Sequence, residues 1–216
     1  SISHELRTPI SAITGSVGQL IEGDAADNPK LRSALFHEIS QGANRLNRLV
    51  SNLLDMSRLE SGYLKARLEW IDLNDVINLV LSSLKSKAGN HQLEPKFAAN
   101  LPLAYADFVL LEQALKNLVH NALFHTPPDT RIEIESAQEG AQLLIRVRDF
   151  GEGIPESELS KIFEKFYRMP QAQSGGTGLG LSIARGFVEA QGGTLTAQPN
   201  PEGGICSTIS LPIKQM

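Results

Sequence analysis

The residues best suited to chemistry near the start of the sequence lie in the stretch SHELRTPI, which begins at Ser3. Here His4 is followed directly by Glu5, and Thr8 lies one helical turn further on. A neutral imidazole has a free lone pair near pH 7, and an adjacent carboxylate can orient the ring or take its proton. The stretch is therefore a candidate nucleophilic site. The alternative, which helix position alone favours, is a solvated histidine on a charged helix face.

Pro9 interrupts the same stretch, although the surrounding pattern is helical. Proline inside a helix costs about 3 kcal/mol, because it has no N–H and crowds the preceding turn. Pro9 cannot donate to the carbonyl of Glu5, so the distortion lies beside His4. We interpret Pro9 as a hinge that loosens the helix next to the nucleophile. The competing interpretation is a bend that serves only helix packing.

Two glycine clusters, DFGEGIP and GGTGLGL, bracket one long polar loop and form a second candidate site. The second cluster ends where a helix is expected, so its backbone N–H groups can receive phosphate. Asp149 stands at the end of an expected strand, where its carboxylate can accept a hydrogen bond from an exocyclic amine of a base. Its alternative role is to cap the turn.

The stretch EQALKNLVHNALFHT predicts a helix with Asn117 and Asn121 one turn apart on one face. Amide oxygens suit a hard divalent cation such as Mg2+, which prefers oxygen ligands and keeps water and phosphate in its shell. Two solvated asparagines are the alternative. His120 and His125 are too far apart around the helix to bind one zinc ion together. His125 lies one turn beyond Asn121, so we expect it at a pocket rim.

Two heptad patterns must position His4. Their apolar residues alternate four and three apart: Leu6, Ile10, Ile13, Val17 and Leu20, then Leu35, Ile39, Leu46, Leu49, Leu53 and Met56, with Gly42 as the non-aliphatic member. The polar stretch EGDAADN between them predicts a turn, hence an antiparallel helical hairpin. One hairpin buries too little surface to be stable, so we expect two copies to form a four-helix bundle with His4, Glu5 and Thr8 facing outward.

After Gly62 the pattern becomes a mixture of strands and helices that predicts an α/β sandwich, a sheet with helices on one face, so the whole chain is of the α+β class. We expect strands at LEWIDL, 92–98, 193–197 and 205–212, a hairpin of 130–138 with 141–150, and helices within 72–88, 107–125 and 181–191. Asp72 is the expected cap of the first of these helices.

The composition limits the classes of protein that need considering. Hydrophobic residues make up 41% and charged residues 20%, which is ordinary for a soluble globular protein. The net charge of −4 argues against a nucleic-acid partner. The single cysteine, Cys206, rules out an internal disulfide and is expected in the core of a late strand. No apolar run is long enough to span a membrane, and the uncapped start suggests a piece of a longer polypeptide.

Five stretches resemble, in order, the motifs of the histidine kinase core of two-component signalling. SHELRTPI resembles the H box, LKNLVHNALFHT the N box, DFGEGIP the G1 box, IFEKFYR the F box and GGTGLGLSIA the G2 box. The resemblance implies a dimerisation and histidine-phosphotransfer hairpin over residues 1–62 and a Bergerat-type (GHKL) ATP-binding domain over residues 63–216. RLVSNLLDMSRLESG, LPLAYADFVLLEQAL and PEGGICSTISLP add a narrower resemblance to the KdpD branch of potassium- and turgor-responsive sensor kinases.

The resemblance also implies roles for the candidate residues. In the hairpin, His4 is the phosphoacceptor, Glu5 is its acid/base partner, and Thr8 completes a Glu-x-x-Thr pattern linked to dephosphorylation of the partner regulator. The remaining roles concern ATP and Mg2+: Asn121 binds the metal, Asn117 lies near the phosphates, Asp149 reads adenine, Gly151 and Gly153 let the backbone close on the nucleotide, Gly176, Gly178 and Gly180 shape the lid, and Arg168 reaches the γ-phosphate.

The implied activity is an ATP-dependent protein-histidine kinase, which passes its phosphoryl group to an aspartate of a response regulator, KdpE-like in the KdpD branch. The implied setting is a homodimer in the soluble, cytoplasmic part of a bacterial inner-membrane sensor. Phe124 and His125 depart from the N box, which usually carries Lys and Tyr there. A kinase biased to phosphatase activity and a weakened dimeric scaffold therefore remain alternatives. A GHKL ATPase that is not a kinase is a separate alternative, and the hairpin with HELRTP argues against it.

Overall fold

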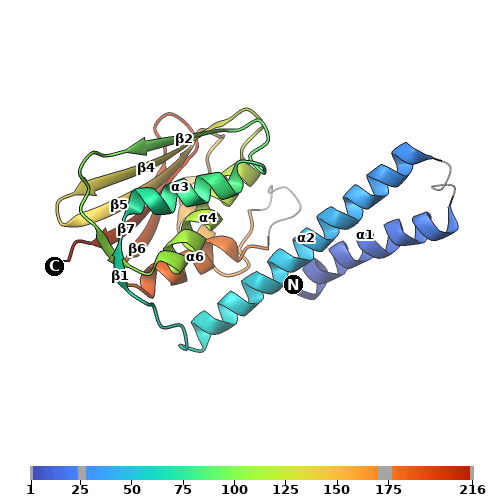
Figure 1. The fold of residues 1–216 in the computed structure, drawn as a ribbon, viewed down its shortest axis with the longest axis horizontal. Coiled ribbons are helices and arrows are strands. Elements are labelled where there is room, and N and C mark those ends of the chain that lie inside the picture. Colours follow the sequence, from blue (N-terminus) through green and yellow to red (C-terminus); the bar gives the residue numbers. More distant parts are fainter. Residues whose placement is uncertain (1, 24–27, 170–176, 215–216) are drawn as a thin grey trace. The chain divides into compact units, whose positions relative to one another are not determined.

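The computed structural model describes residues 2–23, 28–169 and 177–214 (Figure 1). The chain divides into two compact units, residues 1–57 and 58–216, and each is described separately.

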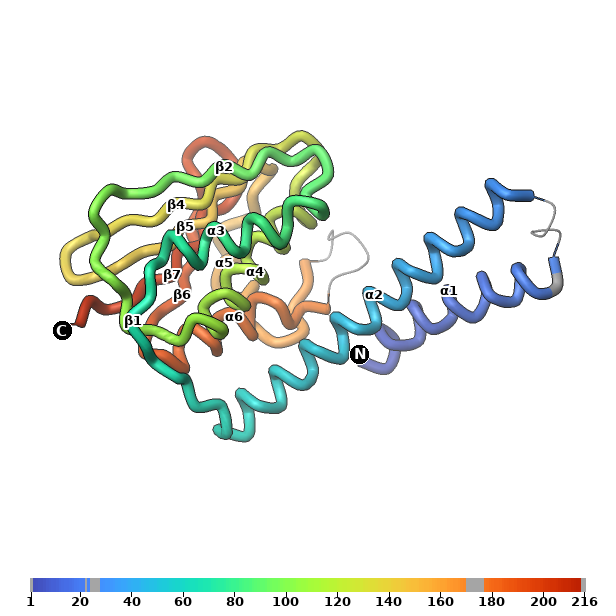
Figure 2. The backbone as a smooth tube through the Cα atoms, viewed as in Figure 1, coloured from blue at the N-terminus to red at the C-terminus, as the bar shows by residue number. Residues whose placement is uncertain are grey.

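The first unit is the predicted helical hairpin. Helix α1 (Ile2–Glu22) and helix α2 (Pro29–Glu60) run side by side in opposite directions, as the tube in Figure 2 shows. The hydroxyl of the buried Ser16 donates to Glu38 Oε2 at 2.8 Å and ties the two helices together. Helix α1 continues without interruption through Pro9.

The stripe of α1 that faces α2 differs from the apolar pattern in the sequence. Pro9 and Ser16 are buried, whereas Ile10 and Val17 keep 46% and 37% of their surface exposed in the single chain. Gly42 explains the difference. A Cβ at this position would lie 2.8 Å from Ile13 Cγ1 and 3.2 Å from the Pro9 carbonyl oxygen, so the missing side chain lets α1 approach α2 closely along the Pro9 stripe.

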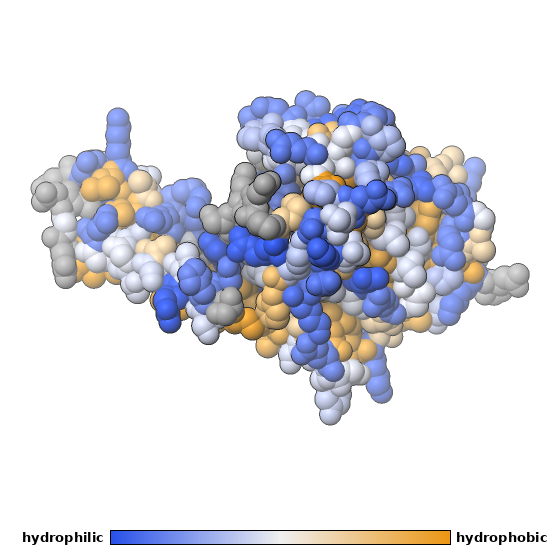
Figure 3. Space-filling model, turned by 180° about the vertical axis from the view of Figure 1, so that it is seen from behind, coloured by the Kyte–Doolittle hydropathy of each residue, from blue (hydrophilic) through white to orange (hydrophobic). Residues whose placement is uncertain are grey.

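Apolar side chains remain exposed on the hairpin after the two helices pack. Figure 3 shows hydrophobic surface on this unit among hydrophilic residues. The exposed members on the two helices include Ile10, Ile21, Phe36, Val50 and Leu54. The hairpin therefore retains an apolar surface that a second copy is able to cover.

The second unit is a five-stranded sheet in the order β2-β4-β5-β7-β6, with helices on one face (Figure 1). Only the β2–β4 pair is parallel. The elements are β1 (Glu69–Ile71), α3 (Leu73–Leu84), β2 (Gln92–Phe97), β3 (Ala104–Ala106), α4 (Phe108–His125), β4 (Arg131–Glu139), β5 (Gln142–Asp149), α5 (Glu156–Leu159), the 3-10 helix η2 (Lys161–Phe163), α6 (Gly180–Glu189), β6 (Thr194–Pro199) and β7 (Ile205–Pro212). The predicted sandwich and its main elements are confirmed.

Alternating side chains along the strands divide the sheet into an apolar and a polar face. Ile132 and Ile134 of β4 are fully buried under the helices, while Glu133 and Glu135 project from the other face. Cys206 is buried in β7, as predicted. Strand β3, which pairs with β1, is not among the expected strands.

Aspartate caps begin the two long helices of this unit. The Asp72 carboxylate accepts from the backbone N–H of Asn74 at 2.8 Å, as predicted for α3. Asp107 caps α4 by accepting from the N–H of Leu110 at 3.0 Å, and its second oxygen accepts from the N–H of Arg67 at 2.7 Å. This buried carboxylate fixes where α4, the helix that carries both candidate asparagines, begins.

The close approach at Gly42 is testable by substitution. We expect Gly42→Ala to lower the free energy of unfolding by about 1 kcal/mol, because the added methyl overpacks the contact with Ile13. Gly15→Ala is the control: nothing lies within 4 Å of its added Cβ, and alanine there should stabilise the helix by about 0.5–1 kcal/mol. Urea unfolding followed by circular dichroism measures both. Equal gains for the two variants would contradict the close packing.

Candidate functional site

The candidate nucleophile lies near the start of α1. His4 and Thr8 are exposed, as predicted, and the Thr8 hydroxyl donates to the backbone carbonyl of His4 at 3.1 Å. Thr14 makes the same bond to the carbonyl of Ile10 at 3.0 Å, so the bond is an ordinary one for a threonine on a helix. The imidazole is therefore carried on a helix surface that is open to a second protein or domain.

Glu5 does not face outward as the heptad pattern predicted. Its side chain is only 19% exposed, and Oε2 lies 3.1 Å from a guanidinium nitrogen of Arg45 on α2. The reason is the rotation of α1 described above: Glu5 is one turn before Pro9 and so belongs to the stripe that faces α2. Sequence reasoning missed Arg45. It lies forty residues after Glu5, and local spacing does not show which residues of two helices will pair.

The second candidate site is a small pocket between the helices and the sheet, which is partly open to solvent. It is lined by Leu118, Asn121 and Ala122 of α4, Val147 and Asp149 of β5, Ile205 and Ser207 of β7, Ile162 of η2, and Leu181 of α6. Asn121 and Asp149, which sequence analysis assigned to different motifs, thus line one cavity. Asn117, one turn earlier on α4, is half-buried but does not line it.

Asp149 is held at the end of β5 by backbone groups from two other segments. Its Oδ1 accepts from the N–H of Gly151 at 3.1 Å and from the N–H of Ile205 at 3.3 Å. The Asn200 side chain donates to the Asp149 carbonyl at 3.0 Å. Burial raises the pKa of this carboxyl above its ordinary value, and the two N–H donors oppose that shift.

Gly204, in the loop before β7, packs directly against Asp149. Gly204 has φ +82°, and a Cβ there would lie 2.3 Å from both the carbonyl oxygen and Oδ1 of Asp149. Gly153 of the first glycine cluster lies against Gly204, and Gly151 lies against Thr126 at the end of α4. Asn200, Gly204 and the pocket residue Ser207 were not selected from the sequence. The dipeptide Gly203-Gly204 before a strand was the available signal.

A backbone hydrogen bond joins the F box to the second glycine cluster. The N–H of Phe166 donates to the carbonyl of Gly178 at 2.9 Å, and Phe166 adopts a left-handed conformation with φ +64°. Gly180 is the first residue of α6, as the predicted phosphate-receiving helix start requires. Gly176, also predicted to shape this loop, lies outside the described residues.

Aromatic rings occupy the end of α4, where the sequence departs from the N box. Phe124 stacks with His120 at 6.4 Å between ring centroids and meets His125 edge-on at 5.0 Å. Desolvation of the ring lowers the pKa of His125, and the positive charge of Arg168 lowers it further. Although His125 remains exposed, it and Arg168 are therefore within electrostatic reach of each other, which brings the end of the F box next to the end of the N box.

The donor set fits a magnesium ion that binds together with phosphate. Across the described ranges, no group of three or more His, Cys, Asp or Glu side chains is placed to hold a metal by itself. The Asn121 amide in the pocket offers one neutral oxygen ligand. Mg2+ commonly binds through one or two protein oxygens, with water and substrate phosphates completing its shell.

Comparison with known proteins agrees with this geometry. The profile of the histidine kinase-, DNA gyrase B-, and HSP90-like ATPase family matches residues 106–215, and that of the His Kinase A (phospho-acceptor) domain matches residues 1–62. Sensor protein KdpD of Escherichia coli (strain K12) is 35% identical over 213 residues, which cover 98% of this chain and 24% of KdpD. KdpD of Mycobacterium tuberculosis is 36% identical over 216 residues, which cover 98% of this chain and 25% of that relative.

Among solved structures, histidine kinase ThkA in complex with response regulator protein TrrA matches with a TM-score of 0.76 and 25% identity, over 99% of this chain and 60% of that chain. The chain therefore belongs to the histidine kinase family, whose members are ATP-dependent phosphotransferases, and it resembles the KdpD branch. It spans about a quarter of the length of the two KdpD relatives. None of the described helices is long and apolar enough to cross a membrane.

The raised pKa of Asp149 makes a prediction about stability. A carboxyl whose pKa is higher in the folded than in the unfolded state favours folding while protonated, and this contribution is lost as pH rises through the folded pKa. We therefore expect Asp149→Asn to increase the free energy of unfolding at pH 7 while weakening ADP binding. The gain should vanish below about pH 4, where the carboxyl is protonated in both states.

Urea unfolding at pH 7 and at acid pH measures this effect. The exposed Asp129→Asn is the matched control and should change the free energy of unfolding little at either pH. Destabilisation by Asp149→Asn of equal size at both pH values would contradict the prediction.

The contact between Gly204 and Asp149 makes a second prediction. Gly204→Ala should weaken ADP binding by about tenfold or more, because its Cβ would displace the Asp149 backbone and carboxylate. Gly192→Ala is a close control: Gly192 has nearly the same φ, +81°, but no atom lies within 4 Å of its added Cβ. Both variants carry similar backbone strain, so titration calorimetry with ADP isolates the contact. Equal ADP affinities would show that the contact has no role in binding.

Proposed function

We propose that this chain is the catalytic core of a sensor kinase that transfers the γ-phosphoryl group of Mg-ATP to His4 and then to an aspartate of a response regulator. The single observation that carries the proposal is the pocket shared by Asp149 and Asn121, in a chain whose first helix presents an exposed histidine. A GHKL ATPase that is not a kinase would have no use for that histidine or for the phospho-acceptor hairpin.

In the pocket, each polar group has a distinct task. The Asp149 carboxylate accepts a hydrogen bond from the exocyclic amine of adenine, while Val147 and Ile205 form apolar surface beside the ring. Asn121 provides an oxygen ligand for Mg2+, which neutralises phosphate charge when bound. We assign the phosphates to Asn117, Gly178 and the start of α6 at Gly180, where the first N–H groups of the helix are available.

In the hairpin, His4 and Glu5 have separate roles in phosphoryl transfer. A ring nitrogen of His4 attacks the γ-phosphorus with its lone pair, so an N–P bond forms as the bond to the bridging oxygen of ADP breaks. The proton on the other ring nitrogen then passes to the Glu5 carboxylate. Arg45 holds that carboxylate through Oε2, next to the histidine in sequence. Phosphoryl transfer needs mostly positioning and charge neutralisation, which these groups supply.

The partners follow from the hairpin. Its exposed apolar residues support dimerisation into a four-helix bundle, and the ThkA complex supports a response regulator as the second partner. We assign to Thr8, exposed one turn after His4, a part in dephosphorylating that regulator. The KdpD relatives support a role in potassium or turgor signalling, a KdpE-like regulator and a location on the cytoplasmic side of a bacterial membrane.

The aromatic end of α4 favours a slower kinase. Phe124 removes a cation that the family usually directs at phosphate, and its ring packs between two histidines. The charge of Arg168 reaches His125 at this end of α4, and we assign Arg168 to replace the missing cation. We therefore expect weaker phosphate binding than in kinases with the usual lysine.

Phosphate labelling tests the proposal. We expect the chain, incubated with γ-labelled ATP and Mg2+, to acquire an acid-labile and alkali-stable label on His4. His4→Gln should reduce the label at least about 100-fold, because no other side chain takes the nucleophile's place. His37→Gln is the control, since His37 is also exposed on the hairpin, where it bonds to Gln41, and this variant should label normally.

The remaining outcomes separate the rival functions. Label that persists in His4→Gln would refute the assignment of the phosphoacceptor. Wild-type chain that binds ADP and a receiver domain but takes no label would identify a scaffold or a phosphatase. Nucleotide hydrolysis without any labelled protein would identify an ATPase that is not a kinase.

A further inference from the structure

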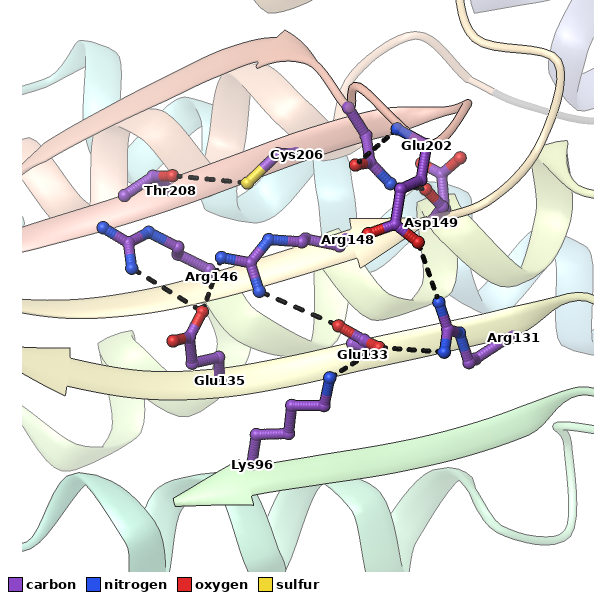
Figure 4. Close-up of polar contacts among 11 residues, drawn as sticks. Lys96, Arg131, Glu133, Glu135, Arg146, Arg148, Asp149, Glu202, Cys206 and Thr208 are labelled. Carbon is purple, nitrogen blue, oxygen red and sulfur yellow. Dashed lines mark hydrogen bonds and ion pairs between the residues drawn. The ribbon is translucent and has the colours of Figure 1, made fainter. Parts of the chain in front are cut away.

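The face of the sheet opposite the helices carries a network of ion pairs, shown in Figure 4. At its centre is Glu133 of β4, whose side chain is only 5% exposed. Three cations surround it: Lys96 at 2.7 Å, Arg131 at 3.3 Å and Arg148 at 3.8 Å. A carboxylate this deeply buried on an uncovered sheet face must be enclosed by the side chains that pair with it.

Arg131 differs from the other cations of the network because it also contacts the first glycine cluster. Its guanidinium lies 3.9 Å from the centroid of the Phe150 ring. A second nitrogen lies 3.5 Å from Glu202, in the loop that presses on Asp149. Glu202 is 74% exposed, so this ion pair contributes little, and the buried Glu133 is the partner that fixes Arg131 over the ring.

The strand register shows what the stack holds in place. Ile132 pairs with Asp149 across β4 and β5, so Arg131 stands opposite Phe150, one residue beyond. Neighbouring residues of a strand point to opposite faces. The Asp149 carboxylate therefore lines the pocket while the Phe150 ring lies on the back of the sheet under Arg131. Fixing the ring restrains the backbone on both sides of Phe150, and hence the orientation of Asp149.

We propose that Arg131 is a positioning residue for nucleotide selection: by stacking on Phe150 from behind the sheet, it aims the Asp149 carboxylate at the adenine amine. The inference rests on the proposed nucleotide site and adds to it a residue that never touches the nucleotide. A firmly aimed carboxylate accepts from the amine of adenine and repels the carbonyl oxygen that guanine carries at the same place. Loosening the carboxylate reduces both effects, so selectivity falls further than affinity for either base.

Calorimetric titration of the whole chain with ADP and with GDP tests the inference. Arg131→Met keeps an unbranched apolar side chain and removes the planar, charged guanidinium group. It should weaken ADP binding about fivefold while changing GDP binding less, so that the ADP-to-GDP affinity ratio falls. Arg131→Lys, which keeps the charge without the planar stack, should recover only part of the ratio.

Two further variants distinguish positioning of Asp149 by Arg131 from a general contribution of the ion pairs to the stability of the sheet. Arg146→Met removes a cation on the same sheet face that pairs with Glu135 and Glu139, away from Phe150, and should leave the ratio unchanged. Phe150→Leu removes the ring from the other side and should lower the ratio as Arg131→Met does. Combining Arg131→Met with Phe150→Leu should lower the ADP-to-GDP affinity ratio no further than either change alone, because both remove the same contact.

The results distinguish the inference from the function on which it rests. Wild-type chain that binds neither nucleotide would overturn both. Wild-type chain that prefers ADP, with an unchanged ratio in Arg131→Met and Phe150→Leu, would overturn the positioning role alone. A fall in the ratio for Arg146→Met equal to that for Arg131→Met would also overturn it, because the effect would then belong to the whole network.

Discussion

The structure of the nucleotide-binding unit depends on how the carboxylate of Asp149 is held. It lies at the end of β5 with little water around it, so its charge needs other partners. The N–H groups of Gly151 and Ile205 supply them, and Asn200 holds the adjacent carbonyl. Three chain segments must therefore converge on one residue. Because burial raises the pKa of this carboxyl, holding it ionised at this place costs stability.

In the hairpin, the corresponding constraint is the contact between Pro9 and Gly42. Because Gly42 has no side chain, α1 packs against α2 along the Pro9 stripe. That rotation turns Glu5 toward Arg45 and leaves His4 and Thr8 exposed. Pro9 is buried where the two helices meet, while the packing bend and the hinge both stay hypotheses. A residue distant in sequence from the histidine decides which side chains accompany it.

The two faces of the sheet serve the pocket in different ways. The apolar face forms its floor and supports the helix that carries Asn121. No described residue forms a covering layer over the polar face of this unit, and its paired charges enclose Glu133 and fix Arg131 against Phe150. A strand that alternates between the faces couples them, because one residue of β5 points into the site and the next points away from it.

The sequence by itself determined the elements and most of the candidate residues, since helical and strand periodicity, aspartate caps and glycine clusters are local patterns. It predicted the hairpin, the sandwich and the motifs that bring Asn121 and Asp149 to one pocket. Only the tertiary structure decided which stripe of α1 meets α2, that Arg45 pairs with Glu5, and that Asn200, Gly204 and Arg131 surround Asp149 and its neighbour. These contacts join residues far apart in the chain, and their geometry depends on packing and strand register, which local spacing does not encode.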